Sequence, residues 1–169
     1  LKLAAKTMNF LTEHKIEQYA DLISRIEEIN AENVKTTDAL KSVEKCLADM
    51  AVLMKHVTTY QKTKPVYEAY RRAKDKDAYR AKQESSLILH EAAVKTLKAA
   101  GITKLPDVAA LRAEYAKLQA QKEALYADYG KLKEQVKEYG IIKKNIDSIL
   151  PRRQEQKRET TREWLALYW

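Results

Sequence analysis

Residues 105–150 read LPDVAALRAEYAKLQAQKEALYADYGKLKEQVKEYGIIKKNIDSIL. After Pro106 no proline interrupts this stretch, and apolar or aromatic side chains recur at alternating steps of three and four residues. This spacing is the heptad period of a coiled-coil helix. The seam positions are Val108, Leu111, Tyr115, Leu118, Leu125, Tyr129, Leu132, Val136 and Tyr139, with Lys122 as the one interruption. A helix ~67 Å long cannot bury such a stripe by itself, so a partner helix is required.

Residues 16–62 supply a partner of similar length, without a glycine or proline. Their seam also alternates steps of four and three. It comprises Leu22, Ile26, Ile29, Asn33, Thr36, Leu40, Val43, Leu47, Met50, Met54 and Val57. Two such helices, separated by residues 63–104, are expected to fold back on each other as an antiparallel hairpin. This pairing would place Val57 near Leu111, Leu47 near Lys122 and Leu22 near Ile146.

Two seam positions of the earlier helix are polar, Asn33 and Thr36. Polar seam residues weaken a coiled coil but can fix its register. The alternative is a frayed or bent middle section. Both interpretations remain open on the sequence alone.

The fold class predicted is therefore all-α: a long antiparallel coiled-coil hairpin with a small helical head at its tip. We divide the single helical domain 1–169 into four parts. They are a short helix and a long helix (1–62), a helical head insert (63–104), the long return helix (105–150) and a basic, aromatic tail (151–169). The closing WLALYW of the tail is expected to pack on the first helix, and the alternative is that it anchors the chain to a lipid surface.

Proline and glycine residues predict where the helices of the head insert begin and end. Pro65 is placed at the first position of a short helix, and the run Lys74–Asp77 is read as a break. A second short helix would carry Tyr79, and a third, near residues 85–100, would end at Gly101 as its C-terminal cap. Pro106 is likewise placed at the first position of the return helix. Pro151 is expected to break or kink that helix at its other end.

The amino-acid composition limits the classes of fold and function that this chain can have. Three Gly, three Pro and one Phe, with 33% charged residues, are typical of long helices around a thin core. The single cysteine, Cys46, excludes an internal disulfide and fits a reducing cytoplasm. No apolar run is long enough to cross a membrane. Because the chain starts at Leu1 rather than Met, we expect it to be a fragment of a longer protein.

No catalytic motif is present in the sequence. The histidines His14, His56 and His90 are far apart, and no Cys/His group has the spacing of metal ligands. With three glycines there is no phosphate-binding loop. We therefore expect no enzyme activity, no metal and no cofactor in this chain.

Positive charge is concentrated in two blocks. Residues 62–82 hold eight basic and three acidic residues, and residues 143–169 hold seven and four, within a net charge of +8. In the first block tyrosines alternate with cations, a combination that can stack bases and neutralise phosphates. The alternative is that the tyrosines pack the head and the cations only keep it soluble. The candidate nucleic-acid-binding residues are Tyr67, Tyr70, Arg71, Arg72, Lys74, Lys76, Tyr79, Arg80 and Lys82.

Five segments together carry a family resemblance. They read AKTMNFLTEH (5–14), VYEAYRRA (66–73), LILHEAA (87–93), KLP (104–106) and LRAEY (111–115). In this order and spacing, the sequence from about residue 3 to residue 150 resembles the C-terminal helical region of relaxases, the mobilisation nucleases of bacterial conjugative and mobilisable elements. The run Lys74–Asp77 departs from that pattern, and the tail after Pro151 is not placed in it.

The resemblance implies a bacterial, cytoplasmic accessory domain. Full-length relaxases nick DNA at a transfer origin through an N-terminal domain with a tyrosine nucleophile and a histidine-bound metal, so a nuclease domain is expected upstream. No segment here matches that histidine motif, so no tyrosine of this chain inherits the nucleophile's role. The implied partners are origin DNA, the coupling protein or another transfer protein, or a second copy. A coiled-coil interaction or dimerisation module without DNA binding is the alternative function.

Overall fold

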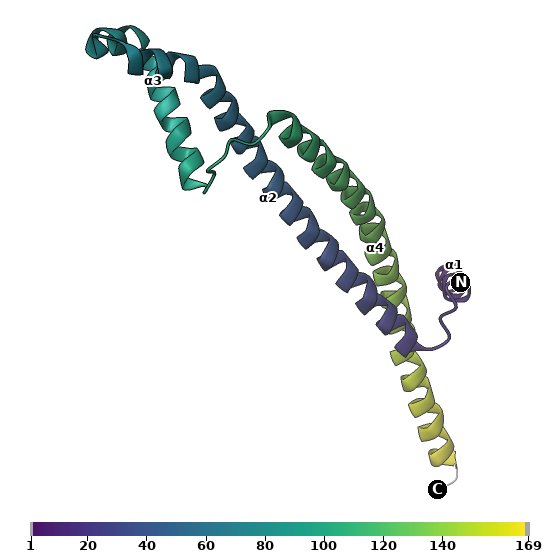
Figure 1. The fold of residues 1–169 in the computed structure, drawn as a ribbon. Coiled ribbons are helices and arrows are strands. Elements are labelled where there is room, and N and C mark those ends of the chain that lie inside the picture. Colours follow the sequence, from purple (N-terminus) through teal and green to yellow (C-terminus); the bar gives the residue numbers. More distant parts are fainter. Residues whose placement is uncertain (1, 168–169) are drawn as a thin grey trace. The chain divides into compact units, whose positions relative to one another are not determined.

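A computed structural model describes the backbone of residues 2–167 and the side chains of residues 2–150 and of Arg162. Its helices are α1 (Lys2–Glu13), α2 (Tyr19–Arg72), α3 (Lys76–Ala99) and α4 (Val108–Leu167), and residues 2–167 contain no strand (Figure 1). The predicted all-α class is confirmed. The long helix α2 packs against α4 as a helical hairpin, also as predicted.

The chain divides into two compact units. The first unit is formed by Leu1–Asp38 with Tyr126–Trp169, and the second unit by Ala39–Leu125. Helices α2 and α4 contribute residues to both units.

The core of the first unit joins α1 to both long helices. Its buried members are Phe10, Leu22, Ile29, Tyr139 and Ile142, and Ile146 packs against them. The rings of Phe10 and Tyr139 meet edge to face, with their centroids 4.9 Å apart. The predicted proximity of Leu22 and Ile146 is confirmed, because Leu22 is buried in this cluster, Ile146 packs against it, and both line the same cleft.

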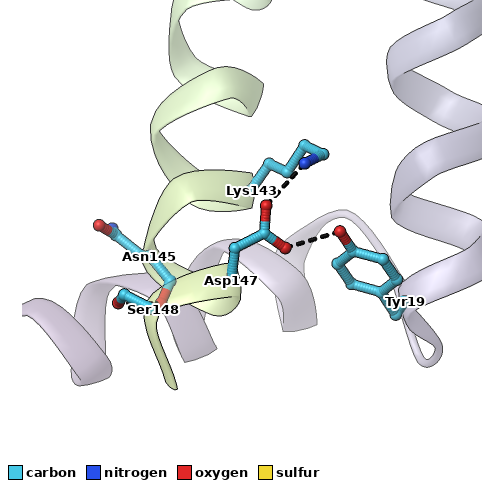
Figure 2. Close-up of polar contacts among 5 residues, drawn as sticks. All are labelled: Tyr19, Lys143, Asn145, Asp147 and Ser148. Atoms are coloured by element: carbon cyan, nitrogen blue, oxygen red, sulfur yellow. Dashed lines mark hydrogen bonds and ion pairs between the residues drawn. The ribbon is translucent and has the colours of Figure 1, made fainter. Parts of the chain in front are cut away.

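A polar contact fixes the register of α2 and α4 in the first unit (Figure 2). Tyr19 Oη donates a hydrogen bond of 2.6 Å to Asp147 Oδ1, and Lys143 Nζ donates one of 2.6 Å to Asp147 Oδ2. These bonds, first that from Lys143, lower the pKa of Asp147 below its ordinary value. The bond to Asp147 in turn raises the pKa of Tyr19 and that of Lys143.

The connection from α1 to α2 is a tight helix end. Lys15 has a φ of +54°, which is uncommon for a residue with a side chain. Its N–H donates to Thr12 O over 3.2 Å, and the N–H of Ile16 donates to Leu11 O over 2.9 Å. This pair of bonds is the Schellman motif, with Lys15 in the place usually taken by glycine. Helix α2 therefore begins at Tyr19 and not at Ile16 as predicted.

In the second unit the seam of α2 faces α4 as predicted. Leu40, Val43, Leu47 and Val57 are buried there. The Lys122 ammonium lies 3.3 Å from Glu44 Oε1, and the Lys122 side chain is 36% exposed. An ion pair therefore accompanies the one interruption of the α4 seam.

Pro65 does not begin a helix. It lies inside α2, which runs on to Arg72, so the predicted helix end near residue 62 is wrong. An internal proline removes one hydrogen bond and crowds a carbonyl, at a cost of about 3 kcal/mol. Packing on both sides opposes this cost, because Thr63 hydrogen-bonds His90 of α3 and Tyr67 stacks on the same ring.

Two expectations about prolines in α4 are wrong: that Pro106 begins the helix and that Pro151 breaks it. Pro106 precedes the helix, which begins at Val108 because Asp107 is a better cap: its Oδ1 accepts the N–H of Ala109 over 3.2 Å. Pro151 does not end α4, which continues to Leu167. The tail is therefore helical over most of its length. The contacts expected of its closing residues 164–169 lie outside the described side chains.

The polar seam positions differ from each other. Thr36 is buried, and the Oδ1 atom of Asn33 is buried without a hydrogen-bond donor among the described residues. Helix α2 is continuous through both residues, so a frayed section is not observed there. No helix of the described part is long and apolar enough to cross a membrane.

Candidate nucleic-acid interface

The head is built from the end of α2 and the returning helix α3. The turn between α2 and α3 lies at Ala73–Asp75, where Asp75 caps α3 by accepting the N–H of Ala78 over 3.0 Å. Thr63 and His90 lie opposite each other, as do Tyr70 and Tyr79, so the two helices run antiparallel. The predicted break is confirmed at residues 74 and 75, whereas Lys76 and Asp77 already belong to α3.

Helix α3 bends at Gln83, whose φ of −121° and ψ of 22° are not helical. Residues 76–99 therefore form one bent helix, whereas two separate short helices were predicted there. Across the bend, the guanidinium of Arg80 pairs with both carboxylate oxygens of Glu91, at 3.1 and 3.2 Å. The pairing raises the pKa of Arg80, with a smaller contribution from a hydrogen bond to Tyr70. The Arg80 guanidinium is therefore occupied by an ion pair that stabilises the bend of α3.

The tyrosines of the head form one row of rings with His90. Tyr60 and Tyr67 both stack on His90, with centroid distances of 5.0 and 4.4 Å. Tyr67 is then 6.3 Å from Tyr70, and Tyr70 is 6.4 Å from Tyr79. All four tyrosines are half-buried. The structure therefore brings the three predicted tyrosines together, and the row also packs α3 on α2.

The predicted cations surround the turn between α2 and α3. Within the described side chains five of them are exposed and make no ion pair within 4.0 Å. These five, called the basic turn below, are Arg71, Arg72, Lys74, Lys76 and Lys82. Arg80 is the sixth predicted cation and stands apart because of its pair with Glu91.

His90 was not predicted as a functional residue. Its residue exposure is 3%, and Nδ1 lies 2.9 Å from Thr63 Oγ1. Because the Thr63 hydroxyl donates to Thr59 O over 2.7 Å, we assign the proton of this contact to Nδ1. Burial lowers the pKa of His90, and the charge of Glu91 partly opposes this. Its position on the apolar face of the third predicted helix gave no signal beyond packing.

A cleft of about 740 Å³ opens beside His90 in the second unit. One wall is a face of α2 from Tyr60 to Arg71, and the other is a face of α3 that carries Lys95 and Lys98. The loop after Gly101 closes one end with Ile102 and Leu105. The cleft thus combines aromatic, aliphatic and cationic walls, and no sequence pattern could reveal it before α3 was placed on α2.

A metal centre finds no support in the part of the chain described. No group of three or more His, Cys, Asp or Glu there could hold a metal ion. His14 belongs to the first unit, where its Nδ1 bonds Phe10 O over 2.9 Å, whereas His90 bonds Thr63 in the second. Cys46 is exposed.

No protein-family model, curated protein or solved structure matches this chain.

Proposed function

We propose that the chain is a non-catalytic accessory domain of a bacterial DNA relaxase, in which the basic turn contacts DNA of a transfer origin or a protein of the transfer machinery in the cytoplasm. The observation that carries the contact surface is a group of five exposed cations beside a row of tyrosines, and within the described side chains these cations make no ion pair. The resemblance of residues 3–150 to the relaxase family supports the biological setting.

The mechanism would be positional. The hairpin of α2 and α4 carries the head, and the bend of α3 presents Lys76 and Lys82 beside the cations that end α2. Phosphate contacts from exposed Arg and Lys supply affinity without reading sequence. Origin recognition itself would remain with the nuclease domain expected upstream.

DNA binding is tested by fluorescence anisotropy with single- and double-stranded DNA over a range of salt concentrations. Affinity should fall steeply with salt, with a log–log slope of about −0.7 to −0.9 for each phosphate contacted. The triple variant Arg72→Ala/Lys76→Ala/Lys82→Ala should bind more weakly and with a shallower slope. The matched control, Lys117→Ala/Lys131→Ala/Lys137→Ala, removes the same charge from exposed positions of α4 and should bind like the natural chain. Absence of binding at about 50 mM salt would contradict the DNA contact.

Self-association is the second candidate function, and it has an observation of its own. In the first unit Leu3 and Met8 of α1 are 64% and 62% exposed, and Ile149 and Leu150 of α4 are also exposed. Met8, Ile149 and Leu150 line a largely apolar cleft of about 440 Å³. Light scattering distinguishes the candidates: a dimer that persists at high salt and dissociates in Met8→Lys favours this module, whereas a monomer excludes it.

A further inference from the structure

The cleft between α2 and α3 has the volume and the lining of a ligand-binding site. Its volume of about 740 Å³ lies within the ~300–1,000 Å³ typical of small-molecule sites. Its apolar part is contributed by Val94, Leu97, Ile102 and Leu105, next to the rings of the row. A ligand here would therefore contact both an aromatic surface and cations.

The charge of the cleft favours an anion. Lys64, Arg71, Lys95 and Lys98 line it, against two acids, Glu68 and Glu91. Both acids already have cationic partners: Glu68 lies 3.9 Å from Lys64, and Glu91 pairs with Arg80. Among the described residues Arg71, Lys95 and Lys98 make no ion pair within 4.0 Å, so three cations are available to a ligand.

The end of α3 does not oppose an anion there. Exposed carbonyls at a helix C-terminus carry partial negative charge. Here the N–H of Gly101 satisfies Lys98 O over 2.9 Å, and the N–H of Ile102 satisfies Leu97 O over 3.0 Å. Gly101 adopts the positive φ of +74° that this Schellman motif requires. The carbonyls of Leu97 and Lys98 are thus satisfied within the chain.

The aromatic wall favours a planar group next to that anion. Tyr60 lines the cleft and is half-buried, and His90 is the one ring that contacts it among the described residues. Because Thr63 lies opposite His90 in the antiparallel pair, Lys95 and Lys98 lie toward the Tyr60 end of the cleft. Arg71 is about 16 Å further along α2. A planar ring at Tyr60 would thus have two ammonium groups within reach.

From these placements we infer that the cleft binds a nucleoside phosphate, with its base against Tyr60 and its phosphate between Lys95 and Lys98. Any base can stack on an aromatic ring, and ammonium groups bind phosphate as point charges. Arg71 would meet a further phosphate only if the nucleotide belongs to a strand. In that case the site rests on the proposed function, as the place where one unpaired base of the DNA is held. A free nucleotide would be an independent ligand.

The first experiment uses calorimetry with dAMP, adenosine and inorganic phosphate. Binding of dAMP should be tighter than that of either part alone, and Lys95→Ala/Lys98→Ala should weaken it by about tenfold or more, as expected for hydrogen bonds to charged groups. Lys117→Ala/Lys131→Ala is the matched control. Tyr60→Phe keeps the ring and should bind dAMP normally, whereas Tyr60→Leu should weaken binding by about tenfold. Helical circular dichroism of each variant verifies its fold.

The second experiment uses a short fluorescent oligodeoxyadenylate and distinguishes the two sources. If a strand is bound, Lys95→Ala/Lys98→Ala removes one phosphate contact and lowers the salt slope by about 0.7, and Arg71→Ala weakens the oligonucleotide but not dAMP. If dAMP binds and the oligonucleotide does not, the cleft takes a free nucleotide and the DNA contact of the proposed function fails. If the oligonucleotide binds equally well to the cleft variants, and dAMP binds no tighter than phosphate, the cleft inference is overturned while the basic turn keeps its role.

Discussion

Arg80 and Glu91 form a two-pronged ion pair between residues of one helix, with nitrogen–oxygen distances of 3.1 and 3.2 Å. Along a straight α-helix these residues would be separated by about 16 Å, which is too far for the pair to form. The contact therefore exists because α3 bends at Gln83. In return it holds the first turns of α3, which carry Lys76, Tyr79 and Lys82, against the rest of that helix.

Loss of this ion pair should loosen the first turns of α3. In Glu91→Gln the charge on the acceptor is lost, so backbone amides of residues 76–82 should exchange with deuterium several-fold faster than in the natural chain, by mass spectrometry. The two side chains are 40% and 48% exposed, so water screens the pair and global unfolding should change little. Glu84→Gln, at an exposed position with no ion pair among the described residues, is the control. Equal exchange in the two variants would show that the bend does not depend on the pair.

His90 should make the stability of the chain depend on pH. Burial lowers its pKa below the ordinary 6.5, and Glu91 opposes this in part, while Tyr60, Thr63 and Tyr67 face the ring from α2. The unfolded chain therefore binds a proton at a higher pH than the folded chain. The contribution of neutral His90 is complete above about pH 6.5 and is lost as pH falls, with a slope of at most about 1.4 kcal/mol per pH unit.

Urea unfolding at about pH 7.5 and pH 5 measures this effect. His90→Phe removes the titrating group and keeps a ring between Tyr60 and Tyr67. Its absolute stability will differ because Thr63 loses a partner, so the quantity compared is the change between the two pH values. That change should be smaller in the variant. An identical change would mean that His90 does not protonate differently in the two states.

The hairpin could be predicted from the sequence because its cause is local and periodic. The heptad steps of α2 and α4 give both the seam and its pairing, as Leu22 with Ile146 shows. Pro65 was misplaced because a local rule competes with contacts that the sequence does not display: Thr63 and Tyr67 touch a histidine far along the chain. The row of tyrosines was visible as a set of candidate residues. The cleft was not, because it exists only once Lys95 and Lys98 face α2.

Lys15→Gly should stabilise the first unit. Lys15 occupies the glycine position of a Schellman motif with a φ of +54°, a conformation that costs a side-chain-bearing residue about 1 kcal/mol. Relief of this strain should exceed the added entropy of the unfolded chain and raise the free energy of unfolding by about 0.5 kcal/mol. Lys6→Gly, inside α1, should instead lower it by about 1 kcal/mol. A loss of stability in Lys15→Gly would show that the lysine side chain makes a stabilising contact.

Asn33→Leu should also stabilise the chain, at a cost in specificity. The buried Oδ1 of Asn33 has no donor among the described residues, and an unsatisfied buried polar atom costs about 1–3 kcal/mol. Leucine at this seam position should raise the free energy of unfolding by about 1 kcal/mol. If Asn33 also fixes the register, light scattering should reveal more than one oligomeric state in the variant. Lower stability in Asn33→Leu would indicate that the amide has a role that its neighbours do not disclose.

Asp147 should control the ionisation of Tyr19. The phenol donates to the carboxylate over 2.6 Å, and a phenolate would be repelled by it, so the pKa of Tyr19 lies above its ordinary value of 10.0. The folded state therefore holds the phenolic proton more tightly than the unfolded state. This contribution to stability is complete below about pH 10 and is lost as pH rises through the folded pKa. In Asp147→Asn the pKa of Tyr19 should fall toward 10.0.

Ultraviolet difference titration measures this shift. The titration of Tyr19→Phe, subtracted from that of the natural chain, isolates Tyr19 among the ten tyrosines. The same subtraction in the Asp147→Asn background should place the transition at lower pH. Lys143→Met tests the opposite charge. Lys143 bonds Asp147 and lowers the pKa of Tyr19. Removal of its ammonium should therefore move the Tyr19 transition to higher pH. Movement of both variants in the same direction would contradict the assigned roles of the two charges.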